Sequence, residues 1–191
     1  MATTTANTLT IAEFDKLDLP KDRDWELHEG ELVEVTFPTI KHKRLQDRVA
    51  DMMKVLFPDC LVLVEFPFQL ADSNDKRCAD VAVIDGARGK VADERGILNG
   101  TPDMVIEVLS PSISASEMRR YRQLCLRHDT QAFWLVDPKD NSVEVYRKDG
   151  TSTVYESGAA VPLSLLGIQT TIAVDAIFAG ITAEGAPPPK A

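Results

Sequence analysis

The sequence has no long hydrophobic run, few cysteines and too few basic residues to balance its acids. None of its apolar stretches approaches the roughly 20 residues that a membrane-spanning helix needs. The first residues, MATTTANTLT, lack the basic segment and following apolar segment of a secretory signal. The three cysteines, Cys60, Cys78 and Cys125, fit neither a metal-binding pattern nor a disulfide framework. We therefore expect a protein of the reducing cytoplasm, with no membrane contact.

The charge balance limits the ways in which the chain can bind nucleic acid. Lys and Arg number 21 and Asp and Glu number 30, which gives a formal net charge of −9. Proteins that hold nucleic acid through phosphate contacts are usually basic on at least one face. The balance therefore argues against simple DNA binding, but it allows a local basic patch or a group of carboxylates that binds a divalent cation. A glycine-rich phosphate loop and a Gly-X-Ser-X-Gly motif are both absent.

The hydrophobic pattern predicts one α+β domain over residues 10–183, with disordered ends over 1–9 and 184–191. A central mixed sheet should pack against helices. The sequence predicts helices over 11–17, 40–57 and 114–127, strands over 60–70, 79–85, 103–110 and 132–138, and hairpins over 25–35 and 142–156. Between them we expect a polar turn over 71–78, a long loop over 86–101, and an irregular apolar segment over 161–182 that ends in a short helix.

Two carboxylates stand in unusually apolar strands. Glu107 lies within the run Met-Val-Ile-Glu-Val-Leu, and Asp80 opens the run Asp-Val-Ala-Val-Ile. Strands of this kind are usually buried on both faces, where an ionised carboxylate needs a partner or a metal ion. One interpretation is that Glu107 pairs with a core arginine and that Asp80 caps a turn. The other is that the two acids share a hard divalent cation, such as Mg²⁺, which accepts oxygen ligands from both.

Four stretches carry a resemblance to a known family. They are WELHEGELVEV (25–35), RCADVAVID (77–85), PDMVIEVLSPS (102–112) and AFWLVDP (132–138). Together they resemble the Uma-two family of putative restriction endonucleases, a branch of the PD-(D/E)XK nuclease superfamily. The likeness covers roughly residues 10–180. It implies a restriction-endonuclease-like core, with a central mixed sheet, flanking helices and extra β-hairpins near both ends of the chain.

The resemblance also implies the site. Asp80 and Glu107 match the motif acids that hold one or two Mg²⁺ or Mn²⁺ ions, Glu31 matches a further acid, and His42 stands at the family's histidine position. The bound metal would polarise the scissile phosphate and activate a water molecule. The superfamily lysine two residues after the glutamate is replaced here by Leu109. A lysine that relatives carry on the next helix is replaced by Tyr121. These departures put turnover in doubt more than fold or metal binding.

Arginines beside Tyr121 could supply charge, although their pKa is too high for them to relay a proton. Arg120 and Arg122, with Arg119, could line a phosphate-binding cleft together with the basic start of the helix over 40–57 (Lys41, Lys43, Arg44 and Arg48). The alternative is that both sets form solvated faces. His42 could likewise act as a base, hold a phosphate or merely cap its helix.

Three functions therefore remain open. The first is a metal-dependent endonuclease that cleaves phosphodiesters, with DNA as the expected partner. The second is a catalytically lapsed nuclease fold that binds nucleic acid or protein. The third is an interaction protein whose acidic surface meets a basic partner. A homodimer would suit a palindromic duplex, because dimers are the commonest oligomers, although nothing in the residues demands one.

Overall fold

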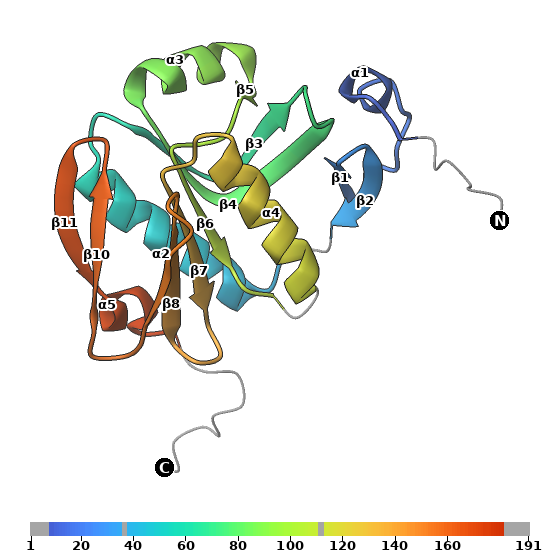
Figure 1. Ribbon diagram of the computed structural model, residues 1–191. Helices are drawn as coiled ribbons and strands as arrows, with labels where there is room; N and C mark the ends of the chain where they lie inside the picture. The colour runs from blue at the N-terminus through green and yellow to red at the C-terminus, as the bar shows by residue number, and fades with distance from the viewer. Residues whose placement is uncertain (1–7, 36–37, 111–112, 182–191) are drawn as a thin grey trace.

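The computed structural model describes residues 8–35, 38–110 and 113–181, in which nine strands form one mixed sheet with helices on both faces (Figure 1). The order of strands along the sheet is β2-β1-β4-β6-β7-β8-β9, and β3 pairs with β4 and with the short β5. The strands of this sheet are β1 (Asp24–His28), β2 (Glu31–Val35), β3 (Leu61–Leu70), β4 (Asp75–Ile84), β5 (Leu98–Asn99), β6 (Met104–Val108), β7 (Ala132–Asp137), β8 (Ser142–Arg147) and β9 (Ser152–Tyr155). The β6–β7 and β3–β5 pairs are parallel and the others are antiparallel, so the expected mixed sheet is confirmed.

The remaining elements cover the two faces of this sheet. They are α1 (Ile11–Phe14), α2 (Ile40–Leu56), α3 (Gly86–Arg95), α4 (Ala115–Arg127), α5 (Val174–Phe178) and a separate hairpin of β10 (Ala160–Leu165) and β11 (Ile168–Ala173). Two capping boxes begin helices as the sequence predicts, from Thr10 to Glu13 and from Ser114 to Glu117. Each box satisfies backbone N–H groups of the first helical turn that have no partner within the helix.

The strands carry two hydrophobic cores because the sheet is buried on both faces. In Figure 1, α4 and α3 cover one face, while α2, α5 and the β10–β11 hairpin cover the other. Residues of β6 alternate between the two cores: Ile106 packs on the α2 side and Val105 on the α4 side. All five residues of β6 are buried, as expected for a strand that is apolar on both faces.

Three segments differ from the expectations. Residues 75–78, expected to lie in a polar turn, belong to β4. Residues 86–101, expected to form a loop, contain α3 and β5, and residues 161–182 contain the β10–β11 hairpin before the short helix α5. The glycines of α3 lower its helical propensity, but packing requires them. A Cβ at Gly86 would lie 2.1 Å from the Asp59 carbonyl oxygen, and one at Gly89 would lie 2.6 Å from the Leu61 Cβ. The sequence signal for a loop was therefore a signal for close packing of α3 on β3.

The ends of the chain for which we expect disorder lie outside the described residues, apart from Thr8 and Leu9. Thr8 and Leu9 lie against the hairpin turn: the Leu9 N–H donates a hydrogen bond of 2.8 Å to the Gly30 carbonyl oxygen. No helix within the described part of the chain has both the length and the apolar character to cross a membrane.

Candidate metal and active site

The candidate site lies where two strands part from β4. Along one side, β4 pairs with β3 over nearly its whole length. Along the other side it pairs first with β1, at Lys76, and then with β6, from Val81 to Val83. The stretch between these pairings, Arg77–Asp80, has no strand partner on that side among the described residues. We call this opening between β1, β4 and β6 the fork.

The two motif acids face each other across the end of the β4–β6 ladder. The last backbone pair is Val81 with Ile106, so Asp80 and Glu107 are the next residues in register. The Asp80 N–H donates a hydrogen bond of 3.2 Å to Glu107 Oε1. The Val108 N–H in turn donates one of 2.7 Å to Asp80 Oδ2. Each carboxylate therefore takes the place of a backbone carbonyl of its own strand, which fixes both acids at the fork.

The backbone of β3 is distorted at the same level. Val62 and Val64 of β3 pack toward α2, whereas Phe66 and Phe68 pack toward α4, so the strand changes face between them. Strict alternation would keep all four on one face. The residue at the change is Glu65, whose φ of 49° is uncommon for a residue other than glycine. Such conformations concentrate at functional sites, where surrounding structure holds them in place.

Helix α2 supplies two side chains that hold Asp80. His42 Nε2 lies 3.1 Å from Asp80 Oδ2. Gln46 Nε2 donates a hydrogen bond of 2.8 Å to Asp80 Oδ1. The two residues are four apart and so share one face of the helix. Thr39 caps α2 by accepting from the His42 N–H, which sets the first turn. Both Asp80 oxygens thus have partners, while the Asp80 side chain keeps 19% of its exposure.

Glu107 is the more deeply buried acid, with 8% exposure. Burial, and next the Asp80 carboxylate, raise the pKa of Glu107 well above its ordinary value, and Glu26 of β1 adds to the rise. The bond from the Asp80 N–H and the Tyr121 hydroxyl act in the opposite direction. Two neighbouring carboxylates ionise together at a large free-energy cost unless a cation lies near them.

Further acids surround Cys78, which lies between Arg77 and Asp80 on β4. Burial raises the pKa of the Cys78 thiol first, followed by the carboxylates of Glu26, Glu107, Glu65 and Asp80. Two of these acids, Glu26 and Glu65, lie farther from the centre of the fork and have partners of their own. Glu26 Oε2 lies 2.7 Å from His28 Nε2, and Glu65 is paired with Lys43. The fork is thus strongly acidic, and its inner pair, Asp80 and Glu107, has no salt bridge to Lys or Arg among the described side chains.

Helix α4 closes the fork from the other face with Tyr121. The ring packs between Phe68, at 6.3 Å between centroids, and Phe133, at 5.7 Å. The guanidinium of Arg77 lies 5.2 Å from the centre of the Tyr121 ring. The tyrosine hydroxyl is buried and makes no hydrogen bond of ordinary geometry with the described residues, although it lies near enough to favour the ionised form of Glu107. Tyr121, rather than a lysine, therefore lies beside the buried glutamate.

The donor atoms at the fork suit a hard divalent cation. Asp80 and Glu107 offer carboxylate oxygens, and Mg²⁺ commonly binds one or two carboxylates while water and phosphate oxygens complete its shell. A cation would also remove the repulsion that raises the pKa of Glu107. Across the described part of the chain, no group of three or more His, Cys, Asp or Glu side chains is arranged to hold a metal. The protein would therefore supply two acids, with the remaining ligands coming from water and substrate.

A family model described as putative restriction endonuclease, Uma2, matches residues 11–175 of the chain. The protein belongs to the Uma2 family. A crystal structure of a putative nuclease belonging to DUF820, from Anabaena variabilis ATCC 29413, is 25% identical to this Uma2 protein, with a TM-score of 0.78. The similarity covers 91% of this chain and 99% of that chain. No curated protein matches the chain.

The structure brings three of the six expected site residues of this Uma2 protein together. Asp80, Glu107 and His42 meet at the fork. The other three lie apart from it. Glu31 is exposed on β2, in register with His28, and the acid that β1–β2 brings toward Glu107 is Glu26. Arg120 is exposed on α4, and Arg122 stacks on Tyr146 with its guanidinium 3.7 Å from the ring centre.

The basic start of α2 does not form a free phosphate-binding face. Arg44 donates to the Gly180 carbonyl oxygen at 3.2 Å, and Arg48 donates to the Ala179 carbonyl oxygen. Lys41 donates to the Pro138 carbonyl oxygen at 3.1 Å, and Lys43 is paired with Glu65. Arg44 and Arg48 thus hold the end of α5, while Lys41 and Lys43 contact the end of β7 and strand β3. The sequence pattern alone could not distinguish these contacts from a binding cleft.

Sequence reasoning missed two polar residues at the fork, Glu26 and Gln46. Glu26 stands two residues from His28 in a strand, so alternation alone puts both on one face. Gln46 lies four residues after His42 on the predicted helix, which is a signal that a polar pair shares a face. Neither pattern shows that β1 pairs with β4, and it is this pairing that brings Glu26 to the fork.

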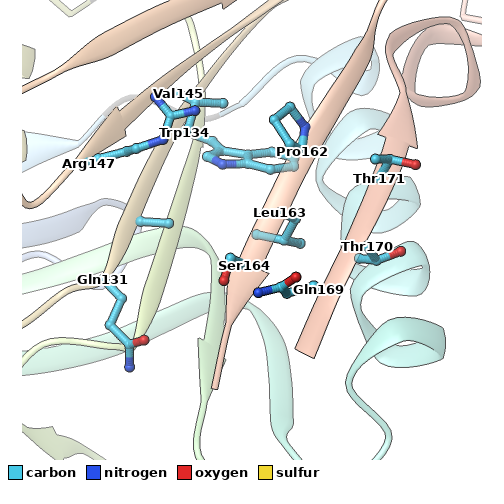
Figure 2. A pocket seen from close by; sticks show the side chains of 11 residues that line it. Gln131, Trp134, Val145, Arg147, Pro162, Leu163, Ser164, Gln169, Thr170 and Thr171 are labelled. Atoms are coloured by element: carbon cyan, nitrogen blue, oxygen red, sulfur yellow. The ribbon is translucent and has the colours of Figure 1, made fainter. Parts of the chain in front are cut away.

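A hollow of the described surface lies away from the fork. A cavity of about 620 Å³ opens between β7–β8 and the β10–β11 hairpin. Figure 2 shows Arg147 and Gln131 on one side, with Ser164 and Gln169 on the other. None of the six expected site residues lines it. Its size alone therefore gives no reason to move the candidate site away from the fork.

Proposed function

We propose that this Uma2 protein is a cytoplasmic, metal-dependent endonuclease that hydrolyses phosphodiester bonds, with DNA as its substrate and Mg²⁺ or Mn²⁺ as its cation. The observation that carries the proposal is the crossed pair of hydrogen bonds that holds Asp80 and Glu107 at the fork. Family membership supports the nuclease class. It also supports metal dependence, because restriction-endonuclease-like proteins generally use divalent metals. The free cysteines Cys60, Cys78 and Cys125 suit a reducing compartment.

The residues of the fork would divide the work. Asp80 and Glu107 would hold the cation, which polarises the scissile phosphate and lowers the pKa of an attacking water when it is bound. His42 and Gln46 would orient the Asp80 carboxylate, because each contacts one of its oxygens. Tyr121 would fix the position of Glu107 from the α4 side. Arg120, exposed on α4, would contact a phosphate of the substrate.

A cleavage assay on a supercoiled plasmid tests this proposal. Asp80→Asn and Glu107→Gln keep the shape of the side chains but remove the charges that hold the cation. We expect both variants to lose Mg²⁺-dependent nicking by at least about 100-fold. The matched controls are Asp93→Asn and Glu94→Gln on the exposed face of α3, which should cleave like the wild type. Cleavage that survives in both fork variants would refute the assignment.

A specific observation favours a second function, that of a lapsed nuclease fold that binds without cleaving. Tyr121 lies beside Glu107 where the family resemblance leads us to expect a lysine. The buried cation that contacts the Tyr121 ring, Arg77, is already bonded to Asp75 at 2.9 Å. No lysine contacts Glu107 among the described residues. A wild type that binds both Mg²⁺ and a DNA duplex but cleaves neither DNA nor RNA would establish this function instead. Light scattering with and without a palindromic duplex would test the expected homodimer.

A further inference from the structure

The exposed face of α4 carries a cluster of arginines. Met118, Tyr121, Leu124 and Cys125 form the buried face of the helix. The exposed side chains of its middle and end are Arg119, Arg120, Gln123 and Arg127. At 100° per residue, these four positions fall within an arc of about 100°. We call Arg119, Arg120 and Arg127 the α4 arginines.

Within the described part of the chain, the α4 arginines are not used to hold other parts of the fold together. Some exposed cations elsewhere are paired, as in Arg23 with Glu34 and Lys148 with Asp129. Others, such as Lys90 and Arg95 of α3, form no ion pair with the described residues. The α2 arginines are bonded to backbone carbonyls of the α5 end. Among the described residues, no α4 arginine forms an ion pair within 4 Å, and the one hydrogen bond of Arg127 goes to the carbonyl of Gln123 in its own helix.

The position of this helix ties its charge to the fork. The buried face of α4 places Tyr121 beside Glu107, so the arginines stand on the opposite surface of the same helix. In Figure 1, α4 lies in front of the sheet, with β1 and β2 to its right. A net charge of −9 repels a polyanion, and an unpaired cationic face is the local feature that can offset this repulsion.

The partner must be long enough to meet the whole face. From Arg119 to Arg127 the helix rises about 12 Å, at roughly 1.5 Å per residue. Over that length, duplex DNA presents roughly seven phosphate charges, at about one per 1.7 Å. A repeating phosphate backbone can therefore meet all three arginines without any sequence requirement. Arginine also matches phosphate better than lysine does, because its planar guanidinium group donates two parallel hydrogen bonds.

We propose that the α4 arginines form a docking surface for the sugar–phosphate backbone of a nucleic acid duplex, on the outer face of the helix whose buried face covers the fork. This proposal rests on the proposed endonuclease function for its choice of partner. It assigns the non-specific part of binding to Arg119, Arg120 and Arg127, and it assigns the α2 cations to holding the fold.

Salt dependence of binding provides the test. The affinity of the wild type for a fluorescently labelled 20-base-pair duplex is measured in EDTA from 50 to 200 mM salt. The variant Arg119→Gln/Arg120→Gln/Arg127→Gln should lose about 0.9 from the slope of log K against log salt for each phosphate contact, or about 2.7 in all. The affinity ratio of wild type to variant should then shrink roughly 40-fold between the two salt concentrations.

Two controls separate the docking surface from total charge. The variant Lys54→Gln/Lys90→Gln/Arg95→Gln removes the same charge from exposed positions on α2 and α3 and should leave the slope unchanged. Replacing the α4 arginines with lysine keeps the charge and should keep most of the slope. Circular dichroism and thermal melting show whether each variant folds as the wild type does.

Each outcome decides the proposal. An equal loss of slope in the two glutamine variants would mean that total charge matters and the face does not. A wild-type slope in the α4 variant would overturn the proposal and leave an acidic protein as the partner of this face. Because binding is measured without metal, the two proposals fail separately. If the α4 glutamine variant has a smaller salt slope but the wild type does not cleave, only the endonuclease proposal is contradicted. If the wild type cleaves and the salt slope of the α4 variant is unchanged, only the docking surface is contradicted.

Discussion

Replacing Glu107 with glutamine should stabilise the protein above mildly acidic pH, and the gain should grow with pH. The amide oxygen of Gln can still accept the 3.2 Å hydrogen bond from the Asp80 N–H, so the variant removes the charge and keeps the contact. Because burial and Asp80 raise the pKa of Glu107 in the folded state, the folded protein holds this proton more tightly than the unfolded chain does.

The sign and size of the effect follow from proton linkage. Below the ordinary pKa of Glu, about 4.3, the carboxyl is protonated in both states and its full contribution to stability is present. As pH rises toward the raised pKa of the folded state, the unfolded chain releases the proton first, and the wild type loses about 1.4 kcal/mol per pH unit. While the pH lies between these two pKa values, the difference between Glu107→Gln and the wild type should therefore grow by about 1.4 kcal/mol per pH unit, or roughly 3–6 °C in Tm.

Urea unfolding in EDTA at several pH values measures this difference. Glu94→Gln, on the exposed face of α3, is the matched control and should differ from the wild type by a small, constant amount. Saturating Mg²⁺ should reduce the pH dependence of the wild type, because a bound cation favours the ionised carboxylate. A difference between Glu107→Gln and wild type that stays constant or falls with pH would refute the burial and charge repulsion inferred for Glu107.

Three other substitutions test the packing around the site. Gly89→Ala should lower stability by about 1–3 kcal/mol, seen as a lower urea midpoint, because its Cβ would lie 2.6 Å from the Leu61 Cβ; an unchanged midpoint would contradict the close packing of α3. Asp75→Ala should lower stability by about 3–5 kcal/mol, because it leaves the buried guanidinium of Arg77 without its partner; the control Asp75→Asn should lose less. Tyr121→Phe removes the hydroxyl that favours ionised Glu107, so the pH dependence of unfolding should extend to higher pH, and an unaltered profile would contradict that contact.

The sequence predicted the sheet and the central acids because local signals determine both. Two capping boxes mark the starts of α1 and α4, and the run of apolar residues around Glu107 marks a strand buried on both faces. An acid in such a strand stands out from residue type alone. His42 was found through the family resemblance, and the structure places it 3.1 Å from Asp80.

The rest of the fork depends on pairings between distant parts of the chain. Glu26 reaches the site because Leu27 of β1 pairs with Lys76 of β4, and no local pattern encodes that pairing. The sequence pattern left the α2 cations free to bind phosphate because their partners are distant in the chain. The Gly180 carbonyl that accepts from Arg44, for example, is 136 residues away. The helix α3 was missed because Gly89 weakens the helical pattern while satisfying a tertiary contact.

The central claim is that one divalent ion binds between Asp80 and Glu107. Anomalous diffraction from crystals grown with Mn²⁺ tests it directly, because the ion can be located without reference to activity. The account predicts a peak within about 2.5 Å of a carboxylate oxygen of each residue, and loss of that peak in Asp80→Asn. Saturating Mn²⁺ that leaves the fork empty, or that binds elsewhere on the protein, would contradict the account.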